Sequence, residues 1–269
     1  MGSMDSNPLV AGKGVQILRD HGIYVETGIL DAECRKLNEV FYHYIATKTP
    51  FVVMKYAMTL DGKIACATGD SKWVTGEIAR TQVHQMRGRY RGIMVGIGTV
   101  LADDPMLNCR VEGGVDPVRI ICDSNLRIPT ESQIVKTASD IETIVACSQE
   151  ALESERKQEK IRRLKEAGIQ IIGTEGAHGV NLVELMKKLG GQNIDSILLE
   201  GGGTLNASAL EDGIVNKVYA YIAGKLIGGM DARSPVEGMG IDRMADAITL
   251  QNVEIEKLGD DFCIVGYVK

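Results

Sequence analysis

From residue 51 onward, short apolar runs alternate with amphipathic stretches, and this alternation constrains the fold more than any other feature. Strands are expected near 51–54, 92–96, 118–122, 142–146, 169–172 and 194–199. Helices are expected over 76–91, 150–167 and 180–189, and in the stretch that ends at Gly213, because apolar residues recur there at helical spacing. Strands that alternate with helices predict an α/β fold with a mostly parallel central sheet and flanking helices.

The C-terminal part of the chain is richer in strands. Apolar runs at 218–222, 249–255 and 262–268 have no long helix between them. The turn residues Gly259-Asp260-Asp261 separate the last two runs, which is typical of a hairpin. We therefore expect antiparallel edge strands at the C-terminal end of the sheet.

Residues 5–48 differ from the rest of the chain. A helix is expected near 31–44, and the apolar residues on one of its faces are Leu37, Val40 and Phe41. The segment is too short to form a stable core alone, so we expect it to pack on the main domain at 49–269 or to derive from a larger unit. Residues 1–4 are typical of an expression scar and are excluded from fold reasoning.

Charge and composition exclude several classes of function. The net charge is −6 with scattered Lys and Arg, which argues against a nucleic-acid or anionic-membrane surface but leaves room for a local phosphate pocket. No apolar run approaches the roughly 20 residues that span a bilayer, and no signal-peptide pattern opens the chain, so we expect a cytoplasmic protein. The six cysteines lack C-x-x-C spacing and no histidine stands at a zinc-ligand offset, so we expect reduced thiols and no metal site.

Two glycine-containing segments follow predicted strands, where α/β proteins place ligand contacts. The segment 55–75 carries Ser71 and the only tryptophan, Trp73, and ends at Thr75, a natural helix N-cap. A ligand contact and a plain connection with Trp73 in the core are equally favoured there. The segment 95–110 contains Gly96-Ile97-Gly98, a weak signal for phosphate, and Asp103-Asp104-Pro105, a common turn initiator.

A third segment, 198–208, gives the stronger phosphate signal. Three glycines, Gly201 to Gly203, follow a buried strand and open a helix, the local geometry that cradles a diphosphate on backbone amides. The segment lacks the ending of a P-loop, and Asn206 stands where a G-x-G-x-x-G would need its third glycine. A flexible connection is less favoured, because successive glycines beside a strand cost conformational entropy.

Arg87 and Arg110 are candidates for binding a charged substrate group, since the guanidinium offers forked donors to phosphate. Arg87 has an alternative explanation. It lies with Arg89 and Arg91 at a helix C-terminus, where cations are mildly favourable.

At these residues the chain resembles the reductase domain of the bacterial bifunctional riboflavin-biosynthesis deaminase/reductase. The most specific motifs are MKYAMTLDGKIA, TGDSKWVT, VGIGTVLADDPMLNCR, LLEGGGTLNASAL and KLIGG. The resemblance implies a dihydrofolate-reductase-like fold and NADPH-dependent reduction of 5-amino-6-(5-phosphoribosylamino)uracil. The H-x-E and P-C-x-x-C motifs of the family's zinc deaminase domain are absent, and residues 5–48 look like the remnant of that region, so neither deaminase activity nor zinc is expected.

The resemblance also assigns site residues. It implies NADPH contacts for Ala57, Trp73, Thr99, Asp103, Ser124 and the turn Gly202, Gly203, Thr204, Leu205, Asn206, Ala207 and Ser208. It implies substrate contacts for Ser71, Arg87, Leu107, Arg110 and Glu200. We expect the arginines to hold the ribose phosphate and the glycine turn to hold the cofactor diphosphate.

The hypothesis for the reaction is that hydride passes from the nicotinamide to C1′ of a ring-opened, imine-like ribosylamine. The cofactor supplies the hydride, and the protein sets the distance and orientation of the reacting atoms. Lys55 is the expected proton donor near the ribose, with Asp103 and Glu200 fixing hydroxyl groups. Ser124 and Arg127, just after a strand, are candidates for binding the 2′-phosphate that distinguishes NADPH.

Two other functions compete with this one. A dihydrofolate reductase would share the fold, but a pteridine needs no phosphate clamp such as Arg87 and Arg110. A non-catalytic nucleotide-binding module is disfavoured because each motif position holds a chemically competent residue. Members of the family are commonly dimers or larger, so we expect a homodimer or higher homo-oligomer.

Overall fold

The computed structural model describes residues 2–5, 7, 10–176 and 179–269, so the first residue of the predicted scar and parts of the segment 5–48 lie outside it. Its centre is a nine-stranded sheet in the order β5-β4-β3-β2-β6-β1-β7-β9-β8. The strands are β1 (Phe51–Thr59), β2 (Gly92–Gly96), β3 (Val118–Cys122), β4 (Thr143–Ser148), β5 (Ile169–Thr174), β6 (Ser196–Leu199), β7 (Val215–Ala223), β8 (Leu250–Leu258) and β9 (Asp261–Val268).

The first seven strands are mutually parallel, and β9 and β8 follow as antiparallel partners of β7 and β9 respectively. The β8–β9 pair is the predicted terminal hairpin. The predicted α/β class, with a mostly parallel sheet and antiparallel C-terminal strands, is therefore confirmed. Parallel strands share one direction, so the loops after β1, β2, β3 and β6 meet at a single edge of the sheet.

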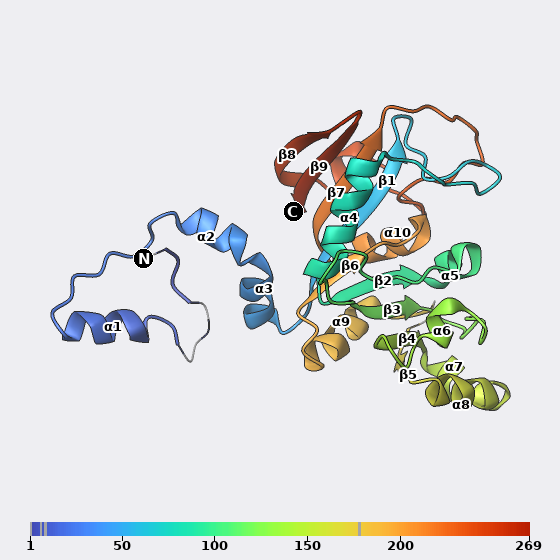
Figure 1. Cartoon of the computed structure of the whole chain (residues 1–269), viewed down its shortest axis with the longest axis horizontal. Helices are drawn as coiled ribbons and strands as arrows, with labels where there is room; N and C mark the ends of the chain where they lie inside the picture. The colour runs from blue at the N-terminus through green and yellow to red at the C-terminus, as the bar shows by residue number, and fades with distance from the viewer. Residues whose placement is uncertain (1, 6, 8–9, 177–178) are drawn as a thin grey trace.

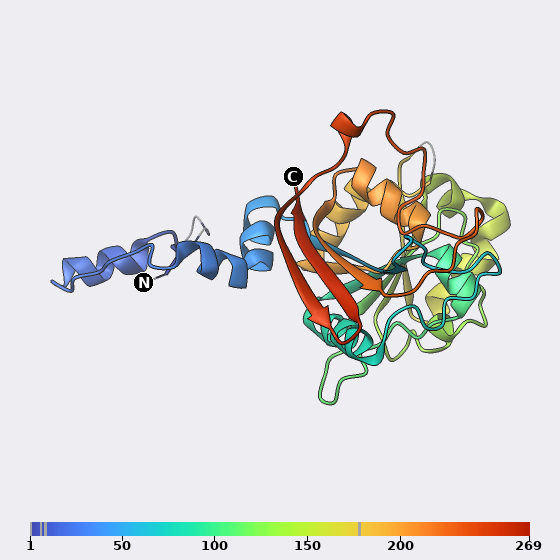
Figure 2. The same ribbon diagram turned by 90° about the horizontal axis from the view of Figure 1, so that it is seen from above.

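Helices cover both faces of the sheet (Figures 1 and 2). The helices of the described residues are α1 (Lys13–Asp20), α2 (Asp31–Leu37), α3 (Glu39–Thr47), α4 (Glu77–Arg89), α5 (Ile97–Asp103), α6 (Gln133–Lys136), α7 (Gln149–Glu153), α8 (Gln158–Glu166), α9 (Leu182–Gly191) and α10 (Gly203–Glu211), of which α1 and α2 lie away from the sheet. Within the described part of the chain, none of them has both the length and the apolar character that a membrane crossing requires.

The core has two sides because side chains alternate along a strand. Val52 and Met54 of β1 face the side covered by α9 and α10. Phe51 and Val53 face the opposite side, where Val83 of α4 packs against them. The same opposite side continues over β2 to β5, where α5 to α8 contribute the apolar residues. Any polar side chain on β1 that shares the register of Val53 therefore lies beneath α4.

Most predicted strands were placed well. The strands at 92–96 and 118–122 have the predicted bounds. The first strand extends from residue 54 to Thr59, because the backbone of its last residues continues the parallel register with Tyr219 to Ala223 of β7. Pairing with a neighbour thus overrides the end of the apolar run.

Three local predictions were wrong. The N-cap of α4 is Gly76, not Thr75, and the Gly76 N–H donates to the Asp261 carboxylate at 2.6 Å. The single helix predicted over 150–167 is divided into α7 and α8 by an extended residue at Ser154. The helix predicted over 31–44 is likewise interrupted at Asn38, and Leu37 is 79% exposed rather than packed.

The N-terminal segment projects from the main body, with only α3 against the sheet (Figures 1 and 2). The attachment is a buried ion pair in which Lys217 Nζ of β7 donates to the Glu39 carboxylate at 2.9 and 3.1 Å, and the Tyr267 hydroxyl donates to the same carboxylate. A second, exposed pair joins Lys36 to Glu254. The segment is therefore anchored at its C-terminal end.

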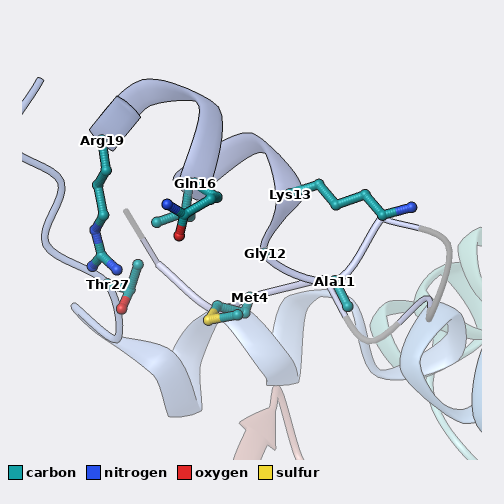
Figure 3. A pocket seen from close by; sticks show the side chains of 8 residues that line it. Met4, Ala11, Gly12, Lys13, Gln16, Arg19 and Thr27 are labelled. Atoms are coloured by element: carbon teal, nitrogen blue, oxygen red, sulfur yellow. The ribbon is translucent and has the colours of Figure 1, made fainter. Parts of the chain in front are cut away.

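A hollow of about 330 Å³ lies inside the projecting segment (Figure 3). Its wall is formed by Met4, Ala11, Gly12, Lys13, Val15, Gln16, Arg19 and Thr27. Arg19 is already hydrogen-bonded to the Val25 carbonyl at 3.0 Å. The residues of the hollow are far in sequence from the charged residues at the carboxyl edge of the sheet. We therefore do not take the volume of the hollow as evidence that it is the active site.

The two ion pairs of the N-terminal segment predict different energetic effects. Lys217→Met leaves the Glu39 carboxylate buried without its cation, so we expect the free energy of unfolding to fall by about 3 kcal/mol. Lys36→Met removes an exposed pair and is expected to leave the free energy of unfolding almost unchanged. Urea denaturation of both variants measures the difference, and equal small losses would show that the buried pair does not anchor α3.

Candidate active site

Three charged side chains from three elements meet beneath α4. Glu200 follows β6 directly, Lys55 lies in β1, and Arg87 lies in the last turn of α4. Arg87 Nε donates to Glu200 Oε1 at 2.7 Å and Arg87 Nη2 donates to Oε2 at 3.0 Å. Lys55 Nζ lies 3.8 Å from Glu200 Oε2. Only 12–14% of each side chain is exposed, so this is a largely buried cluster.

Sheet register explains why these residues meet. Val53 of β1 is paired with Leu198 of β6, and both face α4. Lys55 and Glu200 each stand two residues further on, so they face the same side at the carboxyl edge. Arg87 reaches them from above because its helix lies across that side of the sheet.

The Glu200 carboxylate stays ionised despite its burial. Burial opposes ionisation, but the charges of Lys55 and Arg87, together with the Arg87 hydrogen bonds, outweigh it and hold the pKa of Glu200 at about 2. Burial also opposes the charge of Arg87, but Glu200 in turn raises the pKa of that guanidinium above its ordinary value. The bidentate pair is therefore charged at neutral pH.

Lys55 has a different balance. Burial lowers the pKa of its ammonium and the charge of Arg87 lowers it further, while Glu200 only partly compensates. The ammonium also lies 5.9 Å from the centre of the Tyr221 ring, whose hydroxyl donates to Gln82 Oε1 at 2.7 Å. With two cations around one carboxylate, the cluster keeps a positive charge that suits an anionic ligand.

A second candidate region lies at the start of α10. Gly202 is the N-cap, and no side chain caps the helix at that position. Residues 225–237, here termed the strap, cross its first turn. Glu237 N–H donates to the Gly203 carbonyl at 3.1 Å, the Thr204 hydroxyl donates to Glu237 Oε2 at 3.1 Å, and Asn206 Nδ2 donates to the Pro235 carbonyl at 2.8 Å.

The strap also holds the loop that carries Trp73, and the two loops lie side by side in Figures 1 and 2. The Asp61 carboxylate accepts hydrogen bonds from the N–H groups of Ile227 and Gly228, the latter at 2.7 Å. Lys225 Nζ donates to the Trp73 carbonyl at 2.7 Å. The motifs LDGK and KLIGG, far apart in sequence, therefore form one unit beside α10.

The remaining predicted residues occupy varied places. Trp73 is 62% exposed with the Arg80 guanidinium 4.7 Å from its ring centre, so the alternative that it fills the core is wrong. Ser71 and Ala57 are partly buried, in the same loop and in β1, and Thr99 is partly buried in α5. Ser124 Oγ accepts from Val180 N–H at 3.2 Å, and Arg127 is exposed nearby in sequence.

Some predicted partners of the cluster do not contact it. Asp103 is exposed at the end of α5, and among the described residues no hydrogen bond or ion pair joins it to Lys55 or Glu200. Leu107 is buried with a φ of 51°, in the left-handed region. Arg110 is exposed, and its charge acts on His84 of α4. Sequence reasoning missed two polar residues that are close in sequence to the substrate arginines. They are His84, three residues before Arg87, and Asn108, two residues before Arg110.

Comparison with known proteins gives a consistent result. Residues 50–264 match the family model described as the RibD C-terminal domain. The chain is 48% identical over its full length to a protein of Actinobacillus pleuropneumoniae named riboflavin biosynthesis protein RibD, and spans 70% of it. It is 40% identical to a protein of Methanothermobacter thermautotrophicus named 2,5-diamino-6-ribosylamino-4(3H)-pyrimidinone 5′-phosphate reductase, and the match covers 82% of this chain and 99% of that protein.

Solved structures agree. A structure of Acinetobacter baumannii RibD superimposes with a TM-score of 0.82 at 30% identity, over 100% of this chain and 72% of that one. A Thermotoga maritima protein described as a deaminase and 5-amino-6-(5-phosphoribosylamino)uracil reductase gives the same TM-score at 32% identity, over 100% of this chain and 70% of that one. The expected resemblance is confirmed at the level of both sequence and fold.

The charge balance of the cluster predicts a pH-dependent stability. Because the pKa of Glu200 is about 2 in the folded chain and near 4.5 when unfolded, its stabilisation is complete above pH 4.5 and is lost as pH falls toward 2. We expect Glu200→Gln to lose about 3 kcal/mol at pH 7 and progressively less below pH 4.5. Denaturant unfolding across this range measures it. Glu159→Gln is the control, since Glu159 also has a pKa of about 2 but is fully exposed, and it should leave stability almost unchanged.

Proposed function

The chain belongs to the RibD C-terminal domain family, and from that membership we propose that it is an NADPH-dependent reductase of riboflavin biosynthesis. Its proposed reaction is reduction of 5-amino-6-(5-phosphoribosylamino)uracil to 5-amino-6-(5-phosphoribitylamino)uracil. The observation that carries the proposal is the cluster of Lys55, Arg87 and Glu200, a buried carboxylate with two cations at the carboxyl edge of the sheet. The name of the Methanothermobacter relative supports a ribosylamino-pyrimidine 5′-phosphate as the substrate class.

The arginines divide the work of binding the substrate phosphate. Two of the five N–H groups of Arg87 are already bonded to Glu200, so its guanidinium contributes charge and the remaining N–H groups of Nη1 and Nη2. Arg110 is exposed, and its fork is the better placed for direct contact with a phosphate. Ser71 offers a hydroxyl from the neighbouring loop.

The start of α10 fits a cofactor diphosphate. A side-chain carbon added at Gly202 would meet nothing within 4 Å, so the N-cap is open to close approach, whereas one added at Gly203 would lie 2.5 Å from the Ser234 carbonyl of the strap. The Glu237 carboxylate on the Thr204 hydroxyl indicates that this turn accepts an anion. Gly202 to Ser208 would hold the diphosphate, with Trp73 and Ser124 contacting other parts of the cofactor. When bound, NADPH supplies the hydride.

The chain's own residues supply binding and a proton. The lowered pKa of Lys55 makes its ammonium a better acid than an ordinary lysine, so we assign it proton donation beside the ribose. Glu200 stays ionised, so it can accept a hydrogen bond from a ribose hydroxyl. We also propose that Asp103 binds a second ribose hydroxyl. The support for this role is that Asp103 is exposed in α5 and therefore accessible to a ligand.

We assign residues 5–48 to the remnant of a preceding deaminase-like region and 49–269 to the reductase domain. Apolar side chains of the segment are exposed, among them Ile17, Tyr24, Leu30 and Leu37 at 58%, 87%, 65% and 79%, as expected of a surface that packs on another domain. The protein is proposed to act in the cytoplasm as a homodimer or larger homo-oligomer.

The single tryptophan provides the first test. Titration of the protein with NADPH should quench Trp73 emission saturably, and NADH should bind about tenfold or more weakly, because it lacks the 2′-phosphate. A combined Ser124→Ala and Arg127→Ala change should reduce this preference. An unchanged NADPH/NADH ratio in that variant would remove both residues from the 2′-phosphate site, and no response to either cofactor would contradict the cofactor assignment.

The role of Lys55 predicts a loss of turnover without a loss of binding. Lys55→Ala leaves the Arg87–Glu200 pair intact, so we expect a folded protein whose kcat falls about 10²-fold or more, while the NADPH titration stays normal. Lys217→Met is the matched control, since Lys217 is also buried and paired with a carboxylate but lies outside the site. Consumption of NADPH at 340 nm measures both, and full turnover by Lys55→Ala would exclude Lys55 as proton donor.

A further inference from the structure

Five buried side-chain polar atoms of the described residues have no hydrogen-bond partner, and two of the five lie on the two elements that carry the substrate arginines. They are Nδ1 of His84, in α4, and Oδ1 of Asn108, in the segment after α5. Buried polar groups in folded proteins are nearly always hydrogen-bonded, so each exception needs a reason. Leaving such a group unsatisfied lowers stability, and replacing it with an apolar group commonly does not.

The two residues belong to one region. His84 stands one helical turn before Arg87 and therefore shares its face of α4. Asn108 stands between the proposed substrate residues Leu107 and Arg110. The two elements touch, since a side-chain carbon at Gly88 would lie 3.1 Å from Cys109 Sγ. The charges that act on His84 are those of Arg87, Arg110, Glu200 and Lys55, so its ring lies among the charged groups of the site.

We propose that His84 and Asn108 are further substrate-binding residues, which hydrogen-bond the hydroxyl groups of the ribose. This inference rests on the proposed function and extends it from the phosphate to the sugar.

The chemistry of the two side chains favours a hydroxyl over a phosphate. The Asn108 oxygen can only accept a hydrogen bond, so a phosphate oxygen, which is also an acceptor, would leave it unsatisfied. A neutral imidazole has one donor and one acceptor nitrogen. Burial first, and then the charges of Arg87 and Arg110, lower the pKa of His84, which keeps it neutral. A hydroxyl both donates and accepts, so it can satisfy either residue.

The test uses His84→Leu and Asn108→Ala, with His43→Leu as the matched control. His43 is another partly buried histidine, but it belongs to α3, packs edge-on against Phe51 and lies outside the site. Binding of ribose 5-phosphate and of inorganic phosphate is measured by titration calorimetry, which requires no turnover. Thermal unfolding of each variant and turnover of the pyrimidine substrate by the wild-type protein are measured in parallel.

We expect both site variants to bind ribose 5-phosphate about tenfold more weakly, bind inorganic phosphate normally, and have an unchanged or higher unfolding midpoint. The control should bind both ligands normally. Unchanged ribose 5-phosphate binding, equal weakening for both ligands, or a lowered midpoint with normal binding would overturn the inference. Failure of the wild-type protein to reduce the pyrimidine would instead contradict the proposed function, so the two failures are distinguishable.

Discussion

The parallel pairing of β1 with β6 is the constraint on which the site depends. It brings residues about 145 positions apart into one register, Val53 opposite Leu198, and so places the next charged residue of each strand at the same edge. The helix α4 must then lie across that edge for Arg87 to reach Glu200. A buried carboxylate with two cations would be costly in isolation. Here the β1–β6 pairing sets Lys55 Nζ 3.8 Å from Glu200 Oε2, and α4 brings Arg87 within hydrogen-bonding distance of the same carboxylate.

The sequence was informative about elements whose own residues determine them. The run at 92–96 is apolar throughout, and the run at 118–122 is apolar except for Arg119, so local composition was enough to place both strands. It was less informative where a distant partner decides. β1 continues through Lys55 because β7 pairs with it, and the Asp261 carboxylate, not Thr75, satisfies the start of α4. The break at Ser154 could not be predicted, because neither a glycine nor a change in the apolar pattern marks that position in the sequence.

The same division holds for the candidate site. Guanidinium chemistry pointed to Arg87, the family resemblance assigned Glu200 a substrate contact, and Lys55 was chosen as the group beside the ribose. The structure brings the three together. Their mutual distances could not be predicted, because they follow from sheet order. Single-residue chemistry gave no reason to select His84, whose significance depends on a nitrogen that burial leaves without a partner. The strap was also unpredictable, because the residues it joins lie far apart in sequence.

The strap gives the start of α10 a resident anion. A cofactor diphosphate that accepts from the Thr204 hydroxyl would displace the Glu237 carboxylate from it, so binding would exchange one anion for another. The observed affinity for the cofactor then equals the intrinsic affinity of the turn multiplied by the fraction of molecules in which the Glu237 carboxylate is away from Thr204. If that fraction were about one in ten, the observed affinity would be about tenfold weaker than the turn alone could provide. Glu237 would thus act as an internal competitive inhibitor, setting the cofactor concentration at which the enzyme becomes occupied.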